Sequence, residues 1–167
     1  MALTNLLIAL SMLLFTGFPG VTSDSFIDQQ LPTVAVWDLV NLNPAEDIGV
    51  DMGELLAVMV IETLSESGTF QIVERERLIL VLKELNLSSV NLVDQSTRLR
   101  IGRIAGARFM VFGSYFVQAD KMRVDLRMVE VETGSIVKAT QKTTSADDLH
   151  GWLKNVREAA QELIYHY

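Results

Sequence analysis

The chain has 167 residues, of which 49% are hydrophobic, and a formal net charge of −7. This length is enough for one domain with a sizeable core. An acidic domain repels nucleic acid and anionic lipid, and the sequence has no basic stripe with interleaved aromatic residues. We therefore predict no nucleic-acid partner.

An apolar run occupies residues 6–18, and a Pro-Gly pair and small residues up to Ser23 follow it. The run is short for a bilayer span and is typical of a secretory signal peptide. We predict a signal peptide over residues 1–23 and a single domain over residues 24–167. The first five residues contain no Lys or Arg, so an uncleaved N-terminal anchor is the alternative.

The sequence contains no cysteine. An exported protein needs no disulfide if its core is large enough, so this absence is compatible with export. A bacterial lipoprotein, however, needs a cysteine directly after its signal peptide. We therefore expect no lipid anchor, and no transmembrane segment once the signal is cleaved.

The first half of the domain alternates strands with helices. Residues 33–40, TVAVWDLV, form a continuous apolar run that predicts a buried central strand with Trp37 in the core. A helix over residues 51–65, a strand over 69–73, a second helix over 74–85 and a third helix that starts at residue 95 or 96 follow. Gly106 ends the last of these helices, because a residue without Cβ adopts the left-handed conformation at little cost.

The second half begins with a three-stranded meander. Its first strand, residues 108–119, is apolar on both faces, which suits a sheet position covered on both sides. The second strand alternates apolar residues with Lys121, Arg123, Asp125 and Arg127, which is typical of one wet face. Because the apolar phase flips after Met128, we predict a β-bulge near residues 127–129. Thr133-Gly134 predicts a tight turn before a third strand.

A final amphipathic helix is predicted over residues 149–165, so the order is β-α-β-α-α-β-β-β-α. The fold class is α/β (α+β): a mixed β-sheet with helices mainly on one face, and the last helix folded back over the sheet.

No catalytic, cofactor or metal site emerges from the residues. The two histidines, His150 and His166, lie at opposite ends of the last predicted helix, and no nucleophile elbow or phosphate-binding loop occurs. Glu130 and Glu132 stand two apart on the second meander strand, but exposed strand charges are the better interpretation, since no partner base accompanies them. We predict a protein that is not an enzyme, with no cofactor.

The segments IVERERLILVLKELNL, IGRIAGARFMVFGSY and VEVETGSIVKA, with the opening LPTVAVWDL, resemble the CsgG-like family of the curli production assembly and transport component. That family is similar in plan to FlgO, LpoB and the N-terminal domain of TolB. The resemblance covers roughly residues 31–146 and implies a non-catalytic domain of the periplasm in a Gram-negative-type envelope. This chain departs from the curli channel in lacking its lipidated cysteine, and its short predicted turns leave no room for inserted membrane hairpins.

The resemblance implies function through protein–protein contact, with envelope proteins as partners in secretion, appendage assembly or cell-wall synthesis. The alternative is a self-assembling ring or channel subunit, which predicts a homo-oligomer. Two contact surfaces are candidates: the charged strand face Arg123, Asp125 and Arg127, and the apolar flank Val58 and Ile61 of the first helix. A solvated strand face and an intrachain contact are the respective alternatives.

Overall fold

The computed structural model describes residues 30–43, 51–86, 94–119, 121–145 and 148–164. The segment expected to be a signal peptide lies outside these described residues.

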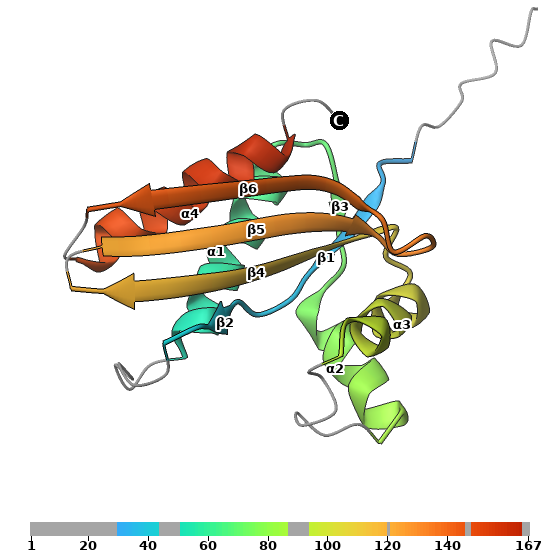
Figure 1. Ribbon diagram of the computed structural model, residues 1–167. Coiled ribbons are helices and arrows are strands. Elements are labelled where there is room, and N and C mark those ends of the chain that lie inside the picture. Colours follow the sequence, from blue (N-terminus) through green and yellow to red (C-terminus); the bar gives the residue numbers. More distant parts are fainter. Residues whose placement is uncertain (1–29, 44–50, 87–93, 120, 146–147, 165–167) are drawn as a thin grey trace, which may run out of the picture.

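One mixed sheet and four helices make up the described structure (Figure 1). In chain order the elements are β1 (Thr33–Val36), β2 (Val40–Asn41), α1 (Met52–Glu66), β3 (Gln71–Ile72), α2 (Arg75–Glu84), α3 (Gln95–Ala105), β4 (Phe109–Gln118), β5 (Lys121–Glu130), β6 (Ile136–Thr144) and α4 (Leu149–Ile164). The predicted α+β class, mixed sheet and element order are confirmed, with β2 as an addition. The helices, expected mainly on one face, lie two on each face of the sheet.

The strands lie in the order β3-β1-β4-β5-β6. β1 pairs in parallel with both β3 and β4, whereas β4, β5 and β6 form an antiparallel meander. β2 pairs in parallel with β4, further along the same edge. The first strand of the chain therefore lies inside the sheet, which explains why its residues are apolar on both faces.

The single strand predicted over residues 33–40 is wrong in one respect, because the chain leaves the sheet between Val36 and Val40. The N–H of Leu39 donates to the carbonyl of Gly53 in α1, at 3.2 Å, and its side chain is buried. Pairing with β4 resumes at Val40, whose side chain is 41% exposed. Burial of Leu39 thus interrupts the strand and turns the next residues outward.

Side-chain caps and one left-handed residue set the helix ends. Asp51 accepts the N–H of Glu54 at the start of α1, and Asp94 accepts the N–H of Thr97 at the start of α3. Gly106 ends α3 with a φ of 82°, as predicted.

The sheet has an apolar core on each face. The larger core lies under α1 and α4 and includes Leu56, Val111, Leu126 and Val156. The smaller core lies under α2 and α3 and reaches β4 only at Met110 and Phe112 and β5 at Val129. Figure 1 shows α1 and α4 along the length of the meander, and α2 and α3 beside one end of it. Much of the second sheet face is therefore not covered by any of the four helices that the structure describes.

The pairing irregularity predicted near residues 127–129 is present, at the step from Met128 to Val129. Its extra residue is Val137 in β6, because Met128 pairs with Lys138 and Val129 with Ile136. The pairing of β5 with β4 continues without interruption through this step. The apolar phase of β5 flips because Val129 enters the smaller core, whereas Met128 faces the larger one.

Candidate functional site

Nine side chains of the meander lie on the sheet face opposite α1 and α4. Cross-strand pairing places them in three rows, and we call them the open sheet face: Phe112, Arg127 and Ala139; Ser114, Asp125 and Gln141; and Phe116, Arg123 and Thr143. The middle and last rows extend beyond α2 and α3, and most of their side chains are partly or fully exposed. The sequence-predicted residues Arg123, Asp125 and Arg127 all belong to this face.

The open sheet face contains a hollow of about 560 Å³. Its walls come from β2 and its following residues, from α3 and from all three meander strands, and include Val40, Leu42, Arg98, Arg127 and Ala139. Val40 and Leu42 are 41% and 56% exposed, so both present apolar surface at the rim of the hollow. The hollow thus combines an apolar rim with two arginines.

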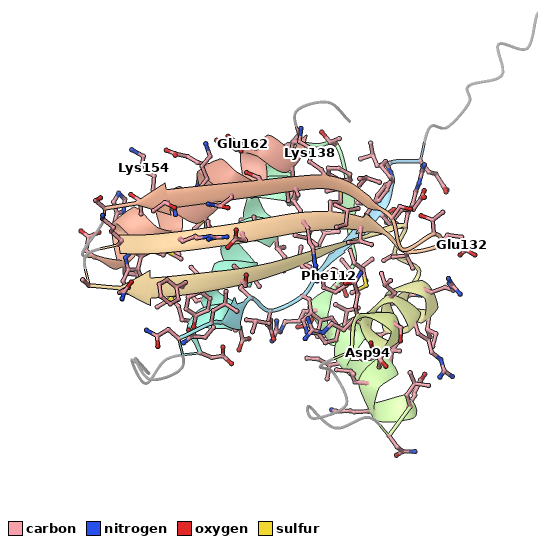
Figure 2. The ribbon with its side chains drawn as sticks, in the orientation of Figure 1. Asp94, Phe112, Glu132, Lys138, Lys154 and Glu162 are labelled. Carbon is pink, nitrogen blue, oxygen red and sulfur yellow. The ribbon has the colours of Figure 1, made fainter. Side chains whose placement is uncertain are left out.

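Phe112 lies where β4 meets α3 (Figure 2). The Cζ atoms of Arg98 and Arg127 are 5.9 Å and 5.7 Å from its ring centroid, within the range of cation–π attraction. Arg98 also lies 5.9 Å from the ring centroid of Trp37. The ring of Phe112 is 3% exposed, so the arginines help to cover it on a face that the described helices cover only in part.

The two arginines repel each other. Burial lowers the pKa of Arg98, and the positive charge of Arg127 lowers it further, while Asp94 opposes both effects. Arg127 forms no ion pair with any other residue that the structure describes. This end of the open sheet face therefore carries concentrated positive charge in an acidic protein.

The other two predicted contact residues on this face already neutralise each other. Arg123 donates three hydrogen bonds to the carboxylate of Asp125, at 2.7 Å to 3.1 Å. The hydrogen bonds with Asp125 raise the pKa of Arg123. Of the three predicted residues, only Arg127 presents a charge without a counterion among the described residues.

The second predicted surface divides between exposed and partly buried positions. Val58 is 39% exposed on the outer side of α1. Ile61 is partly buried and packs against the larger core. Ile61 therefore makes a contact within the chain, as the alternative interpretation held. Of the two residues, Val58 is the one whose side chain is exposed.

Glu130 and Glu132 do not share a strand face, because β5 ends at Glu130. Glu130 accepts a hydrogen bond from the hydroxyl of Thr133 at 2.9 Å, and Glu132 pairs with Arg103 at 3.3 Å. In the part of the chain that the structure describes, no three His, Cys, Asp or Glu residues gather as metal ligands would. Every helix within the same ranges is too short or too polar to cross a membrane.

Sequence reasoning missed the contributions of Arg98, Phe112, Val40 and Leu42 to the site. In the sequence Arg98 is one of several charges on the third helix, and Phe112 is one of several apolar residues in a strand. The alternation of Val40 and Leu42 with two asparagines was the one available signal of outward-facing apolar residues.

A family model described as "Curli production assembly/transport component CsgG" matches residues 29–117. The matched region ends within β4, before β5, β6 and α4. A search of curated proteins finds no match to this sequence.

Several solved structures share the fold at low sequence identity. The LpoB C-terminal domain from Salmonella enterica has a TM-score of 0.59 at 19% identity, covering 71% of this chain and 87% of that one. PelC from Paraburkholderia phytofirmans, solved as a dodecamer, has a TM-score of 0.55 at 14% identity, covering 80% and 88%. Lipoprotein GNA1162 from Neisseria meningitidis has a TM-score of 0.55 at 11% identity, covering 80% and 96%.

These likenesses support the mixed-sheet fold, and the family match spans more than half of the sequence. The chain belongs to the CsgG family.

Proposed function

We propose that this protein is a non-catalytic accessory or assembly factor of the bacterial cell envelope, exported to the periplasm, that binds a protein partner through its open sheet face. The observation that carries the proposal is the exposed part of this face, where three long strands present apolar and charged side chains with no described helix over them. A hollow with exposed aliphatic residues at its rim is typical of interaction sites.

The family supports the envelope setting. The matching family model is named for curli production, assembly and transport. The sequence-based expectation of a signal peptide agrees with export, and the lack of a convergent catalytic constellation in the sequence agrees with a binding role. Secretion, appendage assembly and cell-wall synthesis are the processes in which such a factor would act.

Crosslinking in living cells tests this assignment. A photo-crosslinking amino acid replaces Gln141, which is exposed on the open sheet face, and in a matched control it replaces Gln161, which is exposed on α4. We expect a discrete adduct with one envelope protein at position 141 and none at position 161. If no position on the open sheet face gives an adduct, the binding role of this face is wrong.

Charge reversal provides a second test. Changing Arg123 and Arg127 to Glu reverses two exposed charges without emptying either core, so we expect the circular dichroism spectrum to persist while the adduct at position 141 disappears. An unchanged adduct in a folded variant would remove these arginines from the contact.

A self-assembling ring or channel subunit is the second candidate function. The observation in its favour is the structural likeness to PelC, which was solved as a dodecamer. Light scattering of residues 24–167 after size exclusion without detergent separates the candidates. A discrete multimer of many subunits favours the ring and makes Val58 a candidate subunit contact, whereas a monomer or dimer favours the accessory factor.

A further inference from the structure

We propose that the hollow binds an acidic peptide segment of the partner, with a carboxylate held between Arg98 and Arg127 and a neighbouring apolar side chain packed against Val40 and Leu42. This inference rests on the proposed function and specifies the chemistry that the open sheet face recognises.

Charge complementarity is the first argument. Arg98 and Arg127 both lie within 6 Å of the same ring centroid, at 5.9 Å and 5.7 Å, and their like charges repel each other. A bound carboxylate would turn this repulsion into two attractions. The protein as a whole carries a net charge of −7, which repels anions. An affinity of this site for a carboxylate would therefore come from the two arginines and not from the overall charge.

The nearby carboxylates are already engaged. Asp125 accepts three hydrogen bonds from Arg123. Asp94 caps α3 by accepting from the backbone N–H of Thr97 and from side-chain hydroxyls of the same turn. Neither is an uncommitted counterion for Arg127, so a carboxylate from outside has a reason to bind.

The geometry of arginine suits this task. A guanidinium that stacks on an aromatic face still donates hydrogen bonds from its edge, and it binds carboxylates in a bidentate manner. Stacking on Phe112 therefore orients the guanidinium of Arg127 without using its edge donors, and the buried ring limits the freedom that this side chain loses on binding.

The apolar rim distinguishes a peptide from a simple anion. Val40 and Leu42 line the same hollow as the arginines and are among the exposed large hydrophobic residues of the chain. Burying them gives a ligand hydrophobic stabilisation that a free phosphate or carboxylate ion does not obtain. The hollow of about 560 Å³ falls within the usual size of small-ligand sites, and it is large enough for a few side chains.

Titration with three end-blocked tripeptides tests the proposal. The probes are acetyl-Leu-Glu-Leu-amide, the same peptide with Gln in the centre, and acetyl-Ser-Glu-Ser-amide. The protein is purified from the envelope of cells that express the full chain with isotope labels, and NMR follows the arginine Nε–H signals and the backbone amides of β6. We expect the Leu-Glu-Leu peptide to shift these signals and to bind about fivefold to tenfold more tightly than either of the other two.

Two matched variants separate the site from general charge. Arg127→Gln should reduce the affinity for Leu-Glu-Leu about fivefold. Arg100→Gln removes the same charge from the exposed side of α3, outside the lining of the hollow, and should leave the affinity unchanged. If both variants weaken binding equally, only nonspecific attraction is present and the proposal is overturned.

Two other outcomes also overturn it. Equal affinity for the Glu and Gln peptides would show that the carboxylate is not recognised, and absence of binding by all three would show that the hollow does not take such a segment. In either case an adduct at position 141 in cells would leave the proposed function standing, because that experiment requires a contact with the open sheet face but no particular ligand chemistry.

Discussion

Replacing Arg127 with Met tests whether this residue serves binding or stability. Met keeps a long apolar stem over Phe112 but removes the charge. The Cζ atom of Arg127 lies 5.7 Å from the Phe112 ring centroid, so the change forfeits a cation–π contact of about 0.5–1 kcal/mol at an exposed position. It also relieves the repulsion with Arg98, which by comparison with exposed charge pairs is worth about 0.2–1 kcal/mol.

These two contributions nearly cancel, so we expect the free energy of unfolding of Arg127→Met to stay within about 0.5 kcal/mol of the wild type. Urea unfolding followed by circular dichroism measures it, at about 0.02 M and about 1 M NaCl. Salt screens the repulsion, so the wild type should gain stability relative to Arg127→Met as the salt concentration rises. Arg100→Met serves as the control, because Arg100 is exposed and has no ring contact among the described residues.

A loss of more than about 2 kcal/mol in Arg127→Met would refute this reasoning. It would mean that Arg127 anchors the junction between the meander and α3, and a residue with that task is not available to a partner. If the difference in unfolding free energy between the wild type and Arg127→Met does not change with salt concentration, the inferred repulsion between Arg98 and Arg127 is wrong.

Three further substitutions test the fold. A Cβ at Gly53 would lie 2.2 Å from the carbonyl oxygen of Leu39, so we expect Gly53→Ala to destabilise the protein by about 1–3 kcal/mol in urea unfolding; an unchanged midpoint would contradict the close approach. Phe109 is 1% exposed, and Phe109→Ala should cost about 3–5 kcal/mol in the same assay, whereas a loss below about 1 kcal/mol would place it outside the core. Hydrogen bonds from Lys142 and a threonine lower the pKa of Glu162, so its contribution to stability is present above its unfolded pKa and is lost as the pH falls through its folded pKa. Glu162→Gln should therefore lose less stability than the wild type between pH 7 and about pH 3. If the unfolding free energy of both proteins depends on pH in the same way, the ion pair of Lys142 and Glu162 contributes nothing to stability.

Local sequence patterns were sufficient for most of the fold. The caps at Asp51 and Gly106, and the alternation along β5, depend on interactions within a few residues, so the sequence alone could locate the helices and the meander. The interruption between β1 and β2 could not be predicted in this way, because it depends on Leu39 meeting Gly53 in another element.

The flip in the phase of β5 shows why a correct pattern can have two explanations. A bulge in β5 and a change in which sheet face is covered both exchange apolar and polar positions. The structure has the change of cover at Val129 and the extra residue at Val137 in the neighbouring strand. Only the position of α3 against the sheet distinguishes the two, and no local pattern contains that information.

The same limit applies to the candidate site. Alternation in β5 could indicate Arg123, Asp125 and Arg127 as one face, but it could not separate the paired residues from the unpaired one. That distinction depends on Arg98 and Phe112, which reach the face from α3 and β4.

The interior position of β1 has a consequence for the order of folding. The Thr33 hydroxyl donates to the carbonyl of Gly106, 73 positions later in the sequence, whereas β4 pairs with β5 and β5 with β6, in each case the next strand of the chain. Hairpins of this kind form in about 1–10 μs, while closing a long loop comes later. As the chain is made, β1 emerges first yet has no β4 to pair with until most of the domain has followed. In pulse-labelled hydrogen exchange we expect amides of β5 to gain protection before those of β1, and during that interval an apolar strand is open to wrong partners.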